Sequence, residues 1–269
     1  MIRMIATDLD GTLLAGKSNL PEENIAALRR AMDAGVKVVL SSGRIIEAMT
    51  GLAEKVGVNA PLIVYNGAMV YDPIHDEILY GKTIPCKTAV EVLKYVEATG
   101  QHVQACPGRS YFYREANAWT DYYEDKVGPK GSAVHMPLSE WLSTDIYKLL
   151  CLGDPAVLNK LAADLSKIFP DVSFIKSAET HLEVVAKGVD KADGLRFLSE
   201  KMGIAPEEIL AFGDEHNDLG MLDYAGVGYL MENAPEALHH KNYKIAPKNT
   251  DCGVARIVNL YLNEGRMGG

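Results

Sequence analysis

The chain has 269 residues, enough for one large domain or two smaller ones, and 48% hydrophobic with 23% charged residues is typical of a globular protein. A net charge of −9 disfavours nucleic acid and anionic membranes as partners, although a few placed cations or a metal can still bind a small phosphorylated compound. The four cysteines form no C-x-x-C pair, the N-terminus lacks a signal-peptide pattern and no apolar run is long enough to span a bilayer, so we expect a cytoplasmic protein with free thiols.

The first 80 residues alternate between strand and helix patterns. The predicted elements are a strand over 1–7, a helix over 20–35, a strand over 36–44, a helix over 45–57 and a strand over 61–68. This order predicts a parallel sheet with right-handed crossover connections.

The middle of the chain has its own apolar periodicity and a different order of elements. We expect a helix over 87–100, strands over 102–107 and 110–115, a helix over 118–128, a strand over 146–153, a helix over 155–169, and strands over 172–177 and 181–186. About a hundred residues suffice for a separate core.

The last 80 residues return to the first pattern. A helix is expected over 192–203, a strand over 207–214, a helix over 216–226, a strand over 227–231, and further alternating elements to residue 262. The sequence therefore predicts an α/β protein in which residues 1–81 and 188–269 form one discontinuous, doubly wound parallel-sheet domain and residues 82–187 form an inserted α/β domain.

Polar residues follow the first predicted strand, at the sheet edge where open α/β folds bind ligands. Asp8 and Asp10 are two residues apart, which in an extended chain places them on the same side at about 6–7 Å. Such carboxylates can share a cation, or one can attack while the other transfers protons, and Gly11 permits a turn after them. The alternative is a helix N-cap and a surface aspartate.

Two further clusters follow the same logic. Ser42 and Gly43 lead from the second strand into a helix, where free N–H groups favour an anion, although Ser42 is equally a simple N-cap. Arg44 either binds phosphate or forms a surface ion pair. Lys191 lies at the start of a late helix, where a cation opposes the helix dipole, so a function is indicated unless it is an ordinary solvated lysine.

The stretch 209–222 places Asp214 at another strand end, with Asn217 and Asp218 one helical turn later. Carboxylate and amide oxygens suit Mg²⁺, although a polar N-cap and first turn would look similar. Together the clusters provide a nucleophile, ligands for a hard cation, donors for phosphoryl oxygens and a proton carrier, which is the equipment of phosphoryl transfer.

These motifs resemble the haloacid dehalogenase (HAD) superfamily: D-x-D-G-T after the first strand, serine before Gly-Arg, a lysine opening a late helix, and G-D-x-x-N-D-x-x-M. More narrowly, "YNGA" at 65–68 and "DCGVARIV" at 251–258 resemble the Cof-type sugar-phosphate phosphatases. The resemblance implies a Rossmann-like core with an inserted α/β cap. It also implies a Mg²⁺-dependent phosphatase that acts on a small phosphorylated metabolite, a sugar phosphate above all, as a monomer or a homodimer.

The resemblance also implies roles for individual residues. Asp8 would attack phosphorus to form an aspartyl-phosphate, and Asp10 would protonate the leaving alcohol and then accept a proton from water. The phosphoryl oxygens would be held by the Leu9 backbone N–H, Ser42, Gly43, Lys191 and Asn217. The metal would be bound by Asp8, the Asp10 backbone carbonyl and Asp214. Asp218 would either bind the metal directly or lie just outside its coordination sphere. Ser42, Ala192 and Cys252 depart from the commoner family residues, and none of these departures removes a catalytic atom.

Substrate contacts are harder to assign. Asn66 lies past a core strand end, and His181 and Glu183 alternate on one strand shortly before Lys191, so these residues and Arg44 are candidates. Other candidates in the inserted domain, each of which could equally serve packing, are Arg109, Tyr111, Tyr113, Trp119, Tyr122 and Tyr123.

Two other functions use similar residues. A phosphotransferase or phosphomutase of the same fold would pass the phosphoryl group to a sugar hydroxyl instead of water. A signalling receiver also pairs a strand-end aspartate with Mg²⁺ and a lysine, but receivers are much shorter and have no inserted domain. Dinucleotide binding is disfavoured because no G-x-G-x-x-G follows the first strand.

Overall fold

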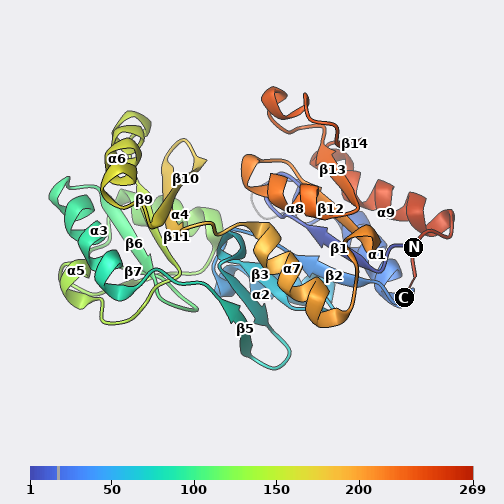
Figure 1. Ribbon diagram of the computed structural model, residues 1–269, viewed down its shortest axis with the longest axis horizontal. Helices are drawn as coiled ribbons and strands as arrows, with labels where there is room; N and C mark the ends of the chain where they lie inside the picture. Colours follow the sequence, from blue (N-terminus) through green and yellow to red (C-terminus); the bar gives the residue numbers. More distant parts are fainter. Residues whose placement is uncertain (17–18, 269) are drawn as a thin grey trace. The chain divides into compact units, whose positions relative to one another are not determined.

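The computed structural model of the protein describes residues 1–16 and 19–268 (Figure 1). It divides into two compact units, one made of Met1–Arg44, Met49–Tyr80 and Asp190–Gly269, the other of Ile45–Ala48 and Gly81–Val189. The second unit is therefore inserted into the chain of the first, and it also includes four residues, Ile45–Ala48, that the sequence prediction places in the first domain.

The first unit is built on a parallel sheet with the strand order β14-β13-β12-β1-β2. Its strands are β1 (Met4–Thr7), β2 (Lys37–Leu40), β12 (Ile209–Gly213), β13 (Val227–Met231) and β14 (Lys244–Ala246). β1 lies inside the sheet and is fully buried, and it pairs with β2 on one side and with β12 on the other. The two segments on either side of the insertion thus form one sheet.

Helices cover both faces of this sheet because both faces of each central strand are apolar. On one face, Met4 and Ala6 of β1 pack in a cluster with Leu195 of α7 (Lys191–Met202) and Met221 of α8 (Leu219–Tyr224). On the other face, α1 (Glu22–Asp33) packs beside α9 (Gly253–Asn263), whose Tyr261 contacts the Tyr229 ring of β13. This doubly wound arrangement confirms the predicted class of the core.

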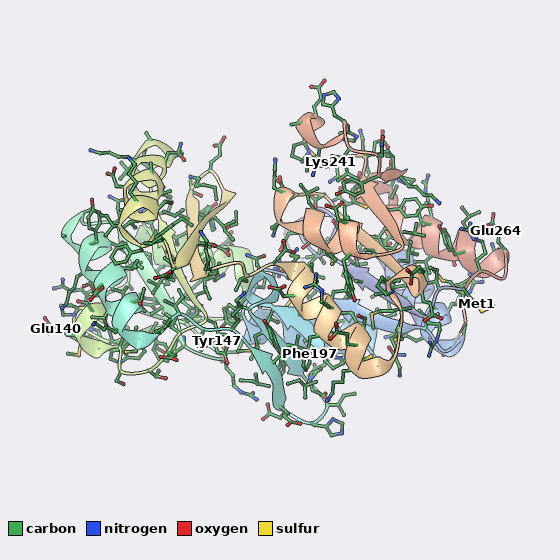
Figure 2. The ribbon with its side chains drawn as sticks, in the orientation of Figure 1. Met1, Glu140, Tyr147, Phe197, Lys241 and Glu264 are labelled. Carbon is green, nitrogen blue, oxygen red and sulfur yellow. The ribbon has the colours of Figure 1, made fainter. Side chains whose placement is uncertain are left out.

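A smaller sheet of β3 (Leu62–Val64), β4 (Met69–Asp72) and β5 (Glu77–Gly81) adjoins β2 through a parallel bridge between Ser41 and Ile63. The strand predicted over 61–68 ends at Val64, because Tyr65–Gly67 turn away in a 3₁₀ segment. β4 and β5 were not predicted. Phe197 of α7, which Figure 2 labels, packs against Tyr80 of β5 with ring centroids 5.3 Å apart, so this sheet is in contact with α7.

The second unit has a mixed six-stranded sheet in the order β10-β11-β9-β6-β7-β8, antiparallel except for β7 with β8. The strands are β6 (His102–Cys106), β7 (Phe112–Tyr113), β8 (Ser132–Ala133), β9 (Lys148–Leu152), β10 (Val172–Ala178) and β11 (His181–Ala186). Its helices are α3 (Cys86–Ala98), α4 (Ala118–Val127), α5 (Leu138–Trp141) and α6 (Pro155–Ile168). Because side chains alternate along a strand, one face of β9 and β11 is aliphatic while Lys148 and Glu183 lie on the other.

The remaining elements are α2 (Ile46–Val56) and the 3₁₀ segments Pro206–Glu208, His216–Asp218, Glu236–Leu238 and Asn249–Asp251. All four cysteines are free thiols. None of the described helices combines the length and the apolar character that crossing a membrane requires.

Candidate active site

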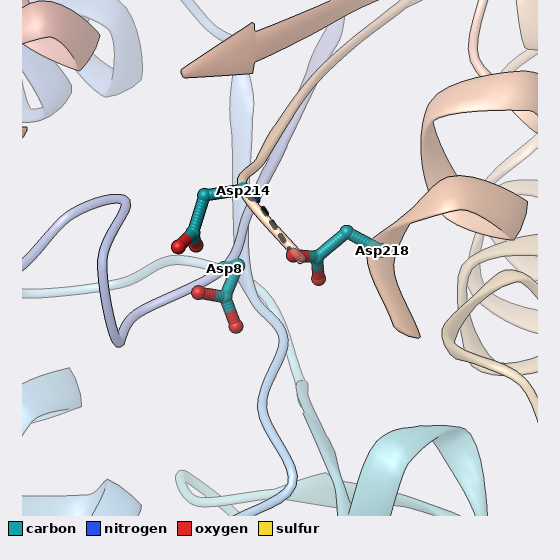
Figure 3. Close-up of side chains that lie close together, drawn as sticks. All are labelled: Asp8, Asp214 and Asp218. Carbon is teal, nitrogen blue, oxygen red and sulfur yellow. Dashed lines mark hydrogen bonds between the residues drawn. The ribbon is translucent and has the colours of Figure 1, made fainter. Parts of the chain in front are cut away.

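Three aspartates meet at the carboxyl edge of the core sheet (Figure 3). Asp8 follows β1, and its backbone N–H donates to the Phe212 carbonyl of the neighbouring β12 at 3.0 Å. Asp214 follows β12, so parallel pairing brings the two carboxylates together. Together with Asp218 they present carboxylate oxygens that all lie within 4.8 Å of one another, and all three residues are buried.

Local hydrogen bonds fix two of these carboxylates. Oδ2 of Asp218 accepts the backbone N–H groups of Asp214 and Glu215, both at 3.0 Å, which closes the turn after β12. The Thr12 hydroxyl donates to Oδ1 of Asp214 at 2.8 Å. A Cβ at Gly11, whose φ is +88°, would lie 2.2 Å from Oδ2 of Asp214, so glycine is needed there for space as well as for conformation.

Lys191 supplies the positive charge of the site. Lys191 is 1% exposed, and its Nζ donates to Oδ1 of Asp8 and to Oδ1 of Asp218, each at 2.5 Å. Lys191 is the first residue of α7, whose N-cap Asp190 accepts the Ala192 N–H at 2.7 Å. Burial alone would lower the pKa of this ammonium, but the adjacent carboxylates of Asp218 and Asp8 outweigh burial and raise the pKa.

Negative charge exceeds positive charge in this cluster. Burial raises the pKa of Asp8 well above its usual range even though Lys191 opposes the shift. Burial and the charge of Asp218 raise the pKa of Asp214 to about 7. Three buried carboxylates around one ammonium fit a hard divalent cation, because such an ion prefers carboxylate oxygens and would balance the excess charge.

We expect this excess charge to make the metal-free protein less stable as the pH rises. The pKa of Asp214 is about 7 in the folded chain and near the ordinary aspartate value when unfolded, so the folded state holds the extra proton between these values. The free energy of unfolding should then fall as pH rises towards 7, by at most about 1.4 kcal/mol per pH unit for each such carboxyl. Urea unfolding in EDTA between pH 5 and pH 8 measures this slope.

The Asp214→Asn variant is the control for this pH dependence. It should have a shallower slope in EDTA because its amide does not titrate, and saturating Mg²⁺ should flatten or reverse the wild-type slope by binding the ionised carboxylates. A metal-free wild-type protein that becomes more stable from pH 5 to pH 8 would contradict this account.

Asp10 is held differently from Asp8. Its side chain is 46% exposed, and its two carboxylate oxygens accept Nε and Nη2 of Arg44 at 2.8 and 2.6 Å. This bidentate pair restricts rotation of the Asp10 carboxylate and holds it in one orientation. The Arg44 guanidinium is thus engaged by Asp10, and its predicted contact with substrate stays a prediction.

The predicted phosphate-binding residues lie around the aspartates. Ser42 is buried and its Oγ accepts the Arg44 N–H at 3.2 Å, and α2 begins at Ile46, one residue after the predicted start, so that Arg44 and Ile45 separate Gly43 from the helix. Asn217 donates from Nδ2 to Oδ1 of Asn66 at 3.0 Å. Leu9 directly follows Asp8 and accepts the Leu14 N–H at 2.8 Å. Their roles toward a ligand stay predictions.

The candidates from the middle of the chain belong to the second unit. His181 and Glu183 are buried on β11, where Glu183 accepts Lys148 Nζ at 3.4 Å and Ser177 Oγ at 3.0 Å. The His181 ring lies 6.2 Å from the ring of Tyr123. The other candidates divide into buried rings and more accessible side chains: Tyr111 and Tyr113 are buried, Trp119 is half-buried, and Arg109 and Tyr122 are exposed. Their contact with a substrate stays a prediction.

Two residues of the site were missed by sequence reasoning. Thr12 fixes Asp214, and the hydroxyl in D-x-D-G-T was the available signal. Asp190 caps α7 and thereby sets the position of Lys191, and aspartate immediately before a predicted helix is an ordinary capping pattern.

The chain was compared with known proteins. The family model for haloacid dehalogenase-like hydrolases matches residues 5–258. Phosphatase YwpJ of Bacillus subtilis is 28% identical over 288 residues, covering 97% of this chain and 100% of the relative. The HMP-PP phosphatase of Yersinia pseudotuberculosis is 29% identical over 275 residues, covering 99% of this chain and 98% of the relative.

Solved structures give the same answer. A haloacid dehalogenase-like hydrolase from Bacteroides thetaiotaomicron matches with a TM-score of 0.88 and 26% identity over 97% of this chain and 99% of its own. A protein from Thermotoga maritima matches with a TM-score of 0.85 and 33% identity over 97% of each chain. The predicted fold class, family and enzyme class are confirmed: the chain belongs to the haloacid dehalogenase-like hydrolases and is a phosphatase of that superfamily.

Proposed function

We propose that the chain hydrolyses phosphate monoesters of small metabolites through a covalent phosphate on Asp8, with Mg²⁺ as cofactor. The observation that carries this proposal is the buried cluster of Asp8, Asp214 and Asp218 around Lys191 at the carboxyl edge of the core sheet. All four residues lie within the part of the chain that the family model matches. A nucleophilic carboxylate, charge-neutralising groups and a second carboxylate on the same loop suffice for phosphoryl transfer to water.

Two carboxylates would divide the work. An Asp8 oxygen attacks phosphorus and the bond from phosphorus to the ester oxygen breaks, while Asp10 gives its proton to that departing oxygen. A water oxygen then attacks phosphorus, Asp10 takes the water proton, and the bond from phosphorus to Asp8 breaks to release inorganic phosphate. Arg44 would support both proton transfers by fixing the orientation of the Asp10 carboxylate, because it donates hydrogen bonds to both oxygens of that group.

The residues present fit Mg²⁺. Asp8, Asp214 and the Asp10 backbone carbonyl would hold the ion, with Asp218 adjacent. When bound, the ion neutralises charge on the transferring phosphoryl group. Leu9, Ser42, Gly43, Lys191 and Asn217 are the groups proposed to hold the phosphoryl oxygens.

The substrate is proposed to be a small sugar or polyol phosphate. One similar protein, 27% identical over 97% of this chain, is named 5-amino-6-(5-phospho-D-ribitylamino)uracil phosphatase, and its named substrate carries a phosphorylated ribityl group. The net charge of −9 further disfavours nucleic acid and anionic membranes. Arg44, Asn66, His181 and Glu183 remain the candidates for contacting the non-phosphate part.

Release of inorganic phosphate from a panel of sugar, polyol and nucleotide phosphates tests the proposal. With Mg²⁺ and water as sole acceptor, at least one ester should be turned over, and EDTA should abolish release until excess Mg²⁺ is restored. Phosphate that appears only when a sugar acceptor is added, or only as a transferred ester, would instead identify a phosphotransferase or phosphomutase. Release that is unaffected by EDTA would contradict the metal requirement.

A further inference from the structure

Three consecutive residues after β3 have left-handed backbone conformations. Tyr65, Asn66 and Gly67 have φ of +53°, +56° and +94°, and in the described part of the chain Tyr65 and Asn66 are the only adjacent non-glycine pair of this kind. Both are buried, at 0% and 2% exposure. Such backbone strain persists only where surrounding contacts impose it, and it concentrates at functional sites.

The first of these contacts ties the segment to the loop after β2. The Asn66 N–H donates to the Ser42 carbonyl at 3.0 Å, and the Tyr65 N–H donates to the Arg44 carbonyl at 3.2 Å. A Cβ on Gly43 would lie 2.8 Å from Oδ1 of Asn66. The Asn66 side chain therefore packs closely against the proposed phosphate-binding backbone of Gly43.

The second contact involves the start of α7. A Cβ on Gly67 would lie 2.0 Å from the Asp190 carbonyl oxygen and 3.0 Å from the Lys191 Cα. Gly67 therefore lies directly against the backbone that carries the site's lysine, and a larger residue would displace it.

The third contact is made by the Asn66 side chain, whose Oδ1 accepts Nδ2 of Asn217 at 3.0 Å. A carboxamide nitrogen has two hydrogens, so this bond fixes the orientation of the Asn217 amide and leaves its second N–H for another acceptor. The strained segment thus contacts the three loops that carry Ser42 and Gly43, Lys191, and Asn217.

We propose that Asn66 is a positioning residue that acts through Asn217: it fixes the Asn217 amide so that its remaining N–H points to a phosphoryl oxygen. This inference rests on the proposed function, and it differs from a direct contact between Asn66 and substrate. Preorganised donors favour a bound anion because no reorientation is needed on binding. Asparagine suits the position because it tolerates left-handed backbone and carries the acceptor.

A double-mutant cycle on the full chain with Mg²⁺ tests the inference, with the dissociation constant of inorganic phosphate measured by calorimetry. Asn66→Gly deletes the acceptor but adopts the left-handed backbone freely, so its melting temperature should not fall, while phosphate binding should weaken about tenfold, the loss of one well-placed hydrogen bond. Asn217→Ala should weaken binding at least as much. The double variant should bind no worse than Asn217→Ala alone, because the effect of Asn66 passes through Asn217.

Two controls separate positioning from stability. Asn66→Ala deletes the same acceptor but strains the backbone, so it should melt below Asn66→Gly and still show the same loss of phosphate binding. Cys252→Gly relieves a left-handed φ of +54° elsewhere in the same unit and should leave phosphate binding unchanged.

The inference would be overturned if the two losses of phosphate affinity multiply in the double variant, or if Asn66→Gly binds phosphate as tightly as the wild type. It would also be overturned if the loss of phosphate affinity follows the fall in melting temperature across the variants. A wild-type protein that does not bind phosphate would overturn it too. A wild-type protein that shows the coupling but hydrolyses no ester would contradict the proposed function alone and leave the positioning role standing.

Discussion

Replacing Asp8 with asparagine is expected to lower kcat for phosphate release by more than about 10⁴-fold, because the amide oxygen is a poor nucleophile and no covalent intermediate can form. The protein should remain folded. Burial raises the pKa of Asp8, so a neutral side chain of the same shape removes an unfavourable buried charge, and Lys191 keeps Asp218 as a partner. In EDTA the melting temperature should therefore be equal to or above that of the wild type.

Two measurements check this expectation. Initial rates of phosphate release are compared for wild type and Asp8→Asn, and acid-quenched samples are analysed by intact mass for covalent phosphate. Asp33→Asn, an exposed aspartate at the end of α1, serves as the matched control and should behave as wild type. Appreciable turnover in a contaminant-free Asp8→Asn preparation would exclude the aspartyl-phosphate route.

Replacing Lys191 with methionine should affect both activity and stability. Under the proposed mechanism, removing the ammonium deprives Asp8 and the phosphoryl oxygens of a preorganised positive charge, so kcat/KM should fall by about 10²–10³-fold. It also leaves Asp8 and Asp218 without their buried partner, which should destabilise the metal-free protein by roughly 3–5 kcal/mol. Mg²⁺ should restore part of this stability, because it replaces the missing positive charge.

Lys148→Met is the matched control for the stability measurement. Lys148 is also 1% exposed and also pairs with a carboxylate, Glu183, but it lies in the second unit. Its removal should likewise be destabilising, yet Mg²⁺ should give no more protection than it gives the wild type. Equal rescue of both variants by Mg²⁺ would show that the ion does not act at the aspartate cluster.

The aspartate cluster could be predicted from the sequence because its residues follow strands that the alternating strand and helix patterns indicate. Asp8 and Asp214 end adjacent parallel strands, and the i,i+4 spacing of Asp214 and Asp218 follows from the turn that joins strand to helix. Strand-end position and short-range spacing are local properties of a sequence. For the same reason Lys191 was correctly predicted at the start of a helix.

What could not be predicted depends on backbone turns and long-range pairing. The strand predicted over 61–68 stops at Val64 because tertiary contacts impose left-handed conformations on Tyr65 and Asn66, which no local preference of tyrosine indicates. Arg44 pairs with Asp10, which lies 34 positions away in the chain, so the local sequence around Arg44 could not identify this partner. β4 and β5 were missed because they form a small side sheet outside the regular alternation that the prediction followed.

The pairing of β1 on both edges has a consequence for the order of folding during synthesis. β1 and β2 are made first, but the other edge of β1 pairs with β12, whose Ile209 is paired with Met4. Until that late strand leaves the ribosome, one edge of this fully buried strand has no partner and Asp8 lacks Asp214 and Asp218 as neighbours. The second unit, by contrast, is fully synthesised once Val189 has been added, before β12 of the first unit is made. Chains truncated before residue 209 should therefore expose an unpaired, apolar strand edge and tend to aggregate.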